Sequence, residues 1–293
     1  MSVVIHTKLS PGVGTGVENG SVGQDEIATN EVVCDGKTYT VLAVFDGHGG
    51  TEDEYFNLSN GAALAGVRVI NSLSDPNNKY GLTGVPDVDK ILEAIHEEFK
   101  SSKDDNSGST ATIVVVNEQN NVEGCIVEGC ILGDSAIRII RDDRTIETYT
   151  GASPNDKATR DQVIARGGEV AYFPEYQAWR VKCPSGGSIA VADCVGNNDT
   201  PGMGKKGVPV KFQLDPEETL LIGSDGLDKI DSRRLDMNFR IAKKTCKGDI
   251  QQTAYMLACS VYAEASRLSA DDVAVILYQP KPNNIASESA AGP

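Results

Sequence analysis

The sequence lacks long hydrophobic runs and segments that would target it to a membrane. No apolar stretch approaches the roughly 18 residues that a membrane-spanning helix needs. The N-terminus has no basic stretch followed by an apolar one, as a secretory signal would, and Ser2 is not a site of N-myristoylation. We therefore expect a soluble, cytoplasmic protein with no membrane partner, and a nuclear location is left open.

Basic residues are also much less frequent than acidic ones. The chain has 27 Lys and Arg residues against 42 Asp and Glu residues, a formal net charge of −15. Such a surface repels a phosphate backbone, so we expect no nucleic-acid partner. Basic protein partners and metal cations fit this charge better.

The seven cysteines include no Cys-x-x-Cys pair. This absence argues against a structural zinc site and against a redox pair. We expect the cysteines to be thiols in a reducing compartment.

The pattern of the remaining residues predicts a single α+β domain. The 293 residues contain no repeat and no linker, so we expect one domain over 1–280 and a disordered tail over 281–293. Strand patterns alternate with pairs of helical patterns but not as regular βαβ units, which predicts two stacked antiparallel β-sheets flanked by pairs of α-helices. Residues 1–30, rich in Gly and Ser, are expected to be loop with at most a short strand. The clearest expected strands are 38–46, 109–117, 122–130, 135–143, 218–226 and 272–279, and the expected helices lie in 58–73, 85–102, 153–170 and 232–268.

Carboxylates stand at the ends of three of these apolar strands. Asp46 follows VLAVF, Asp225 follows TLLIGS, and Asp271 precedes VAVILY. A carboxylate at the end of a buried strand is costly to desolvate unless it is paired or bound to a cation. Oxygen ligands suit magnesium and manganese, and two such ions can clamp the oxygens of a phosphoryl group. These residues therefore indicate a metal site for phosphoryl transfer.

His48 and the glycines of the segment DGHGG extend this hypothesis. Gly47 lets the chain turn after Asp46, so that a main-chain carbonyl can face a metal. His48 lies two residues beyond the proposed ligand, where it can protonate a leaving group. The alternatives are that Asp-Gly is an ordinary turn and that His48 is a structural hydrogen-bonding residue.

Taken in order, the motifs resemble the metal-dependent protein serine/threonine phosphatases of type 2C. The resemblance covers about Asp25 to Tyr278 and agrees with the fold expected above. Each motif alone is weak evidence, but six in the family's order are strong. They are VFDGHGG, SGSTATIVVV, ILGDSAIRII, IARGGEV, IGSDGLDKI and SADDVAVILY.

The resemblance implies a set of metal ligands for two divalent cations, manganese or magnesium, with a third ion left open. Asp46 would bridge the two cations, and the carbonyl of Gly47 would bind one of them. Asp225 and Asp271 would bind the second cation, and Asp25 would match an acidic position that holds metal-bound water.

The resemblance also implies an activity. A water that bridges the two cations would attack the phosphorus of phosphoserine or phosphothreonine, with His48 as the general acid and Asp46 positioning the cations. The partners would be phosphoprotein substrates, and we expect a monomer.

Four positions depart from the family's pattern. No arginine precedes Arg68, whereas the family places a phosphate-binding arginine at about the position of Gly20. Gln24 stands where many members have Glu, Asn197 where an Asp often helps to hold a third metal, and Asp272 where Asn is usual. The ligand aspartates are retained, but the group that grips the substrate phosphate is missing.

Several other charged or aromatic residues have both a functional and an ordinary interpretation. Asp193 is either a substitute metal ligand or a solvated acid, and Lys205 with Lys206 either attracts acidic phosphopeptides or lies in a solvated loop. Arg160 and Arg166 are candidate phosphate contacts but more typical of a helix surface, and Trp179 is expected to pack in the core or a loop.

Two classes of function remain open from the sequence. The first is a divergent phosphatase, which we favour because the aspartates and His48 are all retained. The second is a catalytically weak or inactive pseudophosphatase that acts as a binding or scaffold module. A two-metal nuclease fits the carboxylates but not the charge of −15, so it ranks last.

Overall fold

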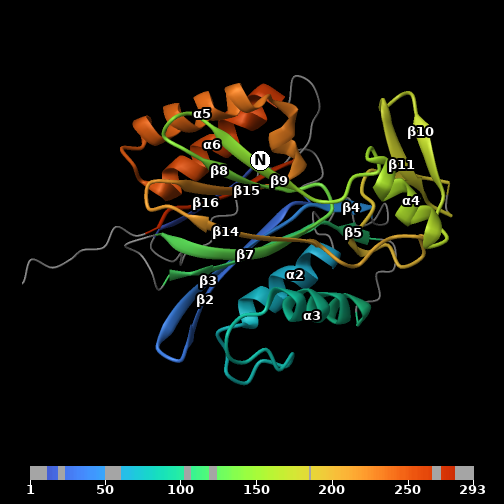
Figure 1. Cartoon of the computed structure of the whole chain (residues 1–293), viewed down its shortest axis with the longest axis horizontal. Coiled ribbons are helices and arrows are strands. Elements are labelled where there is room, and N and C mark those ends of the chain that lie inside the picture. The colour runs from blue at the N-terminus through green and yellow to red at the C-terminus, as the bar shows by residue number, and fades with distance from the viewer. Residues whose placement is uncertain are drawn as a thin grey trace, which may run out of the picture.

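The computed structural model describes residues 12–18, 24–49, 61–101, 107–118, 124–184, 186–265 and 272–280. Figure 1 shows a four-layer sandwich in which two sheets lie between two pairs of helices. The α+β prediction with stacked antiparallel sheets is confirmed. The tail over 281–293 lies outside the described residues, and no described helix is both long and apolar enough to cross a membrane.

Each large sheet has five antiparallel strands. The first sheet has the order β1 (Val13–Glu18), β16 (Val273–Tyr278), β15 (Thr219–Gly223), β8 (Ala136–Ile140) and β9 (Ile146–Thr150). The second has the order β14 (Val208–Leu214), β7 (Cys125–Leu132), β6 (Ala111–Asn117), β3 (Lys37–Phe45) and β2 (Glu26–Cys34).

The central strands are buried on both faces, as their continuous apolar runs predict. In β3, Leu42 and Val44 pack against the first sheet, whereas Val41, Ala43 and Phe45 face the helices on the other side. All of these side chains are fully buried. The sequence VLAVF therefore contributes to two hydrophobic cores at once, and its last residue leads directly to Asp46.

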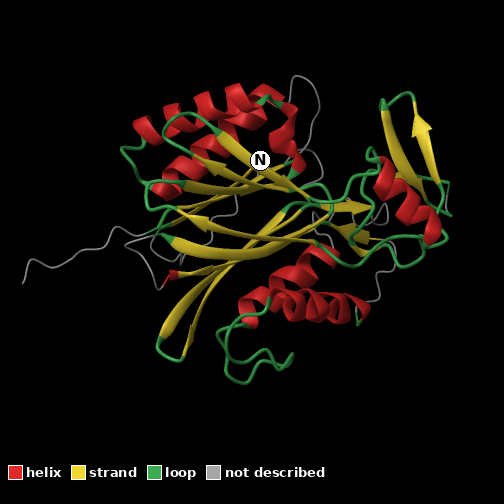
Figure 2. Ribbon diagram, viewed as in Figure 1, coloured by secondary structure: helices red, strands yellow, loops and turns green. Residues whose placement is uncertain are grey.

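Helix α2 (Gly61–Ser72) and helix α3 (Val88–Lys100) cover the second sheet (Figure 2). The side chain of Asp87 caps α3 by accepting hydrogen bonds from the backbone N–H groups of Asp89 and Lys90. Residues at helical spacing, among them Ile91, Ile95 and Phe99, turn the apolar face of α3 inward.

Helix α5 (Ser232–Thr245) and helix α6 (Ile250–Ala265) cover the first sheet. Strand β1 lies directly against α6, and two of its residues are glycines because a larger side chain would clash with the backbone of that helix. A Cβ at Gly14 would lie 2.1 Å from the carbonyl oxygen of Ile250, and one at Gly16 would lie 2.7 Å from that of Ala254. The Gly-rich stretch was expected to be loop with room for a short strand, and β1 is such a strand of 6 residues in close contact with a helix. Strand β2 also begins within the region expected to be mainly loop.

Smaller elements project from one end of the sandwich. A three-stranded sheet has the order β13 (Val195–Gly196), β5 (Ser107–Ser109) and β4 (Gly47–Gly49). Beside it stands a segment that we call the flap, residues 157–189, which contains α4 (Lys157–Ala165), β10 (Val170–Phe173), β11 (Ala178–Lys182) and β12 (Ser188–Ile189). Figure 1 shows the flap next to β4 and β5, away from the four large helices.

Candidate active site

A cavity of about 790 Å³ opens where the flap meets the ends of the two large sheets. Asp46, Gly47, His48 and Asp225 line it, so the structure brings together four of the residues singled out in the sequence. Asp46 follows β3 of one sheet, and Asp225 follows β15 of the other. The strand-end pattern predicted this convergence because the two sheets stack with these ends together.

The backbone around Asp46 is fixed by hydrogen bonds. Thr110 Oγ1 accepts from the N–H of Asp46 at 3.0 Å and lies 2.8 Å from the hydroxyl of Ser135. The N–H of Asp225 makes a longer bond of 3.4 Å to Asp46 Oδ2. Asp225 also begins the short 3-10 helix η2 (Asp225–Lys229), whose last residue likewise lines the cavity.

Gly226 allows the chain to pass close to strand β16. A Cβ at this position would lie 1.9 Å from the carbonyl oxygen of Asp272, so only glycine fits without movement of the backbone. The Asp-Gly pair is therefore more than an ordinary turn, since the glycine lets Asp225 reach the cavity from a crowded strand end.

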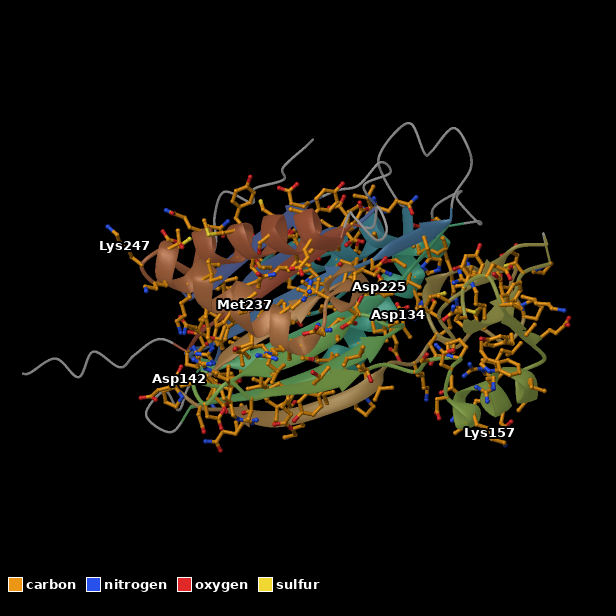
Figure 3. All side chains as sticks on the ribbon, turned by 90° about the horizontal axis from the view of Figure 1, so that it is seen from above. Asp134, Asp142, Lys157, Asp225, Met237 and Lys247 are labelled. Atoms are coloured by element: carbon orange, nitrogen blue, oxygen red, sulfur yellow. The ribbon has the colours of Figure 1, made fainter. Side chains whose placement is uncertain are left out.

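Asp134 is a third carboxylate in the cavity, and the sequence interpretation missed it. Figure 3 labels Asp134 and Asp225 close together near the flap end of the molecule. Burial, reinforced by the negative charge of Asp225, raises the pKa of Asp134 to about 7. The signal was present, because Asp134 lies just beyond the apolar strand β7 and within the motif ILGDSAIRII, but no role was assigned to this residue.

The donor chemistry of the cavity fits divalent cations. Asp46, Asp134 and Asp225 supply carboxylate oxygens from three strand ends, and oxygen donors of this kind are the ligands that magnesium and manganese prefer. No three His, Cys, Asp or Glu side chains of the described residues already form a preassembled metal group. Asp271, another ligand that the resemblance implies, lies outside the described residues.

Asp25 is buried but does not line the cavity. It directly precedes β2, whose first residue Glu26 pairs with Phe45, so its position in the sheet is next to that of Asp46. Gln24 and Asp272 form a bridge nearby, because Asp272 Oδ2 accepts from the N–H of Gln24 at 2.7 Å. The side chain of Asp272 thus joins the start of β16 to the chain that enters β2.

His48 is held by the three-stranded sheet. It pairs with Gly108 in the register of β4 and β5, and its Nε2 donates to Oδ1 of Asn197 at 2.7 Å. Burial lowers the pKa of His48 to about 4; the charges of Arg180 and Lys205 act in the same direction, and the bond to Asn197 opposes them. The imidazole is therefore neutral near pH 7 in this state.

The remaining charged residues of interest turn out to be structural. Asp193 is buried and forms an ion pair of 3.0 Å with Arg166. Neither residue lines the cavity. Lys205 is half-buried and donates to the carbonyl oxygens of Cys194 and Gly196, so the expectation of a solvated loop is wrong for it.

In the flap, Arg160 stacks on the ring of Trp179, with the guanidinium carbon 4.4 Å from the ring centre. Trp179 also meets Tyr172 edge to face at 5.8 Å. Trp179 was expected in the core or a loop, but it lies half-buried on strand β11 and packs against other residues of the flap.

A sandwich of two antiparallel sheets between helix pairs, with an acidic cavity at one end, defines the class of protein. A family model described as Protein phosphatase 2C matches residues 25–183, which is more than half of the chain. The chain belongs to the protein phosphatase 2C family.

Solved structures support the same fold. The serine-threonine phosphatase 2C from Toxoplasma gondii matches with a TM-score of 0.66 and 14% identity, over 92% of this chain and 95% of that one. A C. elegans sex determining protein matches with a TM-score of 0.64 and 20% identity, over 92% of this chain and 65% of that one. The catalytic domain of the serine threonine protein phosphatase PstP, in complex with two manganese ions, has a TM-score of 0.55 and 14% identity, over 91% and 96%. No curated protein matches the sequence significantly.

Proposed function

We propose that this member of the family is an active, metal-dependent hydrolase of phosphoserine and phosphothreonine in proteins. The observation that supports it most is the convergence of Asp46, Asp134 and Asp225 with His48 in one cavity. We further propose that residues 1–280 act as a single catalytic domain.

The proposed cation ligands are Asp46, Asp134, Asp225, Asp271 and the carbonyl of Gly47, with Asp25 supporting them from beside Asp46. When bound, two divalent cations would supply an acidified water and neutralise the charge of the phosphoryl oxygens. The residues of the chain hold these carboxylates at fixed strand ends, so that little reorganisation is needed when substrate arrives.

His48 would protonate the serine or threonine oxygen as it leaves. In this structure the imidazole is buried, its pKa is lowered to about 4, and Asn197 orients it. A phosphoryl dianion bound beside it would raise this pKa, because a negative charge favours the protonated ring. The proton would thus be acquired when substrate is present.

The direct test is hydrolysis of a phosphothreonine peptide and of p-nitrophenyl phosphate during titration with manganese and with magnesium. We expect turnover that requires the metal and that disappears with a chelator and in the Asp225→Ala variant. The absence of turnover in a protein that binds the metals by calorimetry would instead favour the binding or scaffold module.

A further inference from the structure

The structure offers a candidate for the phosphate-binding group that the N-terminal segment lacks. No arginine occurs before Arg68. The residues that line the active-site cavity include two cations, Arg180 and Lys229. Lys229 already lies 3.3 Å from a carboxylate oxygen of Asp225. Arg180 is therefore the cation to examine.

Arg180 comes from β11 of the flap, whereas the carboxylates of Asp46, Asp134 and Asp225 come from strand ends of the two large sheets. Its Nε donates to the hydroxyl of Ser188 at 2.9 Å, and its Nη2 donates to the carbonyl oxygen of Ser188 at 3.2 Å. The guanidinium carbon also lies 4.6 Å from the ring centre of Tyr176. These contacts fix the plane of the guanidinium, and none of them uses Nη1.

Within the described part of the chain, Arg180 makes no ion pair with a carboxylate, whereas two other cations of the flap do. Arg166 is paired with Asp193, and Lys182 with Glu169. Arg160 donates to two backbone carbonyl oxygens, of Pro154 and Asn155, and stacks on Trp179. Arg180 is thus a half-buried guanidinium that is oriented by neutral groups and faces a cavity.

Arg180 and His48, the proposed proton donor, line the same cavity. A phosphoryl group bound in this cavity would therefore lie near both side chains. The guanidinium presents parallel N–H donors that match the oxygens of a phosphate, which a lysine ammonium cannot do in the same way.

We propose that Arg180 binds the phosphoryl oxygens of the substrate from the flap and so takes the part of the arginine missing from the N-terminal segment. This proposal rests on the proposed function, because it assumes a phosphorylated peptide in the same cavity. It also implies that Ser188 and Tyr176 are positioning residues, which hold the guanidinium in place without contacting the phosphate.

The experiment measures kcat and KM for a phosphothreonine peptide at saturating manganese in four proteins: the wild type, Arg180→Met, Arg180→Lys and Arg160→Met. We expect Arg180→Met to raise KM about 10- to 100-fold, the loss typical of a charge-assisted contact. Arg180→Lys should raise KM by an intermediate amount, because it keeps the positive charge but loses the parallel N–H donors of the guanidinium. Arg160→Met removes a cation from the same flap outside the cavity, and its KM should stay within about twofold of the wild type, as a surface substitution allows.

A second measurement does not depend on turnover. Calorimetry compares the binding of the phosphopeptide and of its unphosphorylated form, and inorganic phosphate serves as a competitor. The wild type and Arg160→Met should prefer the phosphorylated form, whereas Arg180→Met should lose most of this preference. Thermal unfolding of each variant establishes that the flap substitution has not unfolded the protein.

The outcomes separate the two proposals. If the wild type binds the phosphopeptide selectively through Arg180 but does not hydrolyse it, the proposed enzymatic function fails and the role of Arg180 stands. If the wild type hydrolyses the peptide and Arg180→Met has the same KM and phosphate competition as Arg160→Met, the role of Arg180 is overturned. The same conclusion follows if the wild type does not distinguish the two peptides.

Discussion

Asp225 has an ammonium group beside it in this structure. Lys229, one turn further along η2, lies 3.3 Å from Asp225 Oδ2, and both side chains are about one-third exposed. Its charge also lowers the pKa of Asp134, against the larger effect of burial. Lys229 therefore offsets part of the repulsion between carboxylates that would otherwise gather without a counter-charge.

A divalent cation at Asp225 would have to compete with this ammonium. We expect Lys229→Met to tighten manganese binding about fivefold, since a partly exposed ion pair contributes up to about 1 kcal/mol. Calorimetry with manganese provides the measurement. Lys211→Met is the matched control, because it removes the same charge from an exposed ion pair between Lys211 on β14 and Glu128 on β7. An equal change of affinity in both variants would mean that only net charge matters.

Gly108 makes room for the contact between His48 and Asn197. A Cβ at Gly108 would lie 1.8 Å from Asn197 Oδ1 and 2.4 Å from His48 Nε2. We expect Gly108→Ala to displace the imidazole and to lower kcat by about 100-fold or more, the usual contribution of a general acid. Gly187→Ala is the control, because this glycine also lines the cavity but has open space at its Cβ position. Unchanged kcat in a folded Gly108→Ala protein would contradict a role for the oriented histidine.

Among the elements, α3 is tied to the segment that follows β13. His96 on α3 donates from Nε2 to the carbonyl oxygen of Lys205 at 3.0 Å. Burial lowers the pKa of His96; the charges of Lys205 and Lys100 also lower it, and the Lys205 carbonyl and Glu97 oppose the change. The folded protein therefore keeps this ring neutral to lower pH than the unfolded chain does.

The sign of the resulting pH dependence follows from proton binding. Below the ordinary pKa of about 6.5 the unfolded chain takes up a proton that the folded protein excludes, so stability falls as the pH drops. We expect His96→Gln, which keeps a donor for Lys205, to lose less stability between pH 7.5 and 5.5 than the wild type. Urea unfolding at both pH values, at one manganese concentration, gives the comparison. Equal losses in both proteins would show that other groups cause the acid sensitivity.

The sequence pattern predicted helices and strands well where apolar residues are continuous. It predicted them poorly where glycines or tertiary contacts determine the secondary structure. Strand β3 and helix α3 follow from their own residues. Strand β1 does not follow from its own residues. Its Gly14 and Gly16 allow the close approach of α6, which lies more than 200 residues further along the chain. The short strands β10 to β13 are likewise held by their neighbours more than by their own pattern.

At the scale of the whole molecule, the proposed metal site joins the two sheets. Asp46 follows a strand of one sheet and Asp225 a strand of the other. A cation bound by both would therefore stabilise the sandwich, because it binds the folded state but not the unfolded chain. At a manganese concentration of about 100 times Kd this effect amounts to about 2.7 kcal/mol.

We expect manganese at that concentration to raise the unfolding temperature by about 5–10 °C, and a chelator to reverse the change. Differential scanning calorimetry with Asp46→Ala as the control tests it, since that variant should lose the bridging ligand and most of the shift. A shift of wild-type size in Asp46→Ala would contradict the placement of the metal site.

The sequence by itself determined the α+β class, the stacked sheets and four of the cavity residues, Asp46, Gly47, His48 and Asp225. It could do so because each lies just beyond an apolar strand, and the end of a buried strand is a local property of the chain. The tertiary structure decided the rest. Only folding brings Asp134 near Asp225, pairs Asp193 with Arg166, orients His48 through Asn197 and turns Arg180 of the flap toward the cavity. These relations join residues far apart in the sequence, and the distance between such residues is set by the packing of the sheets and not by any pattern along the chain.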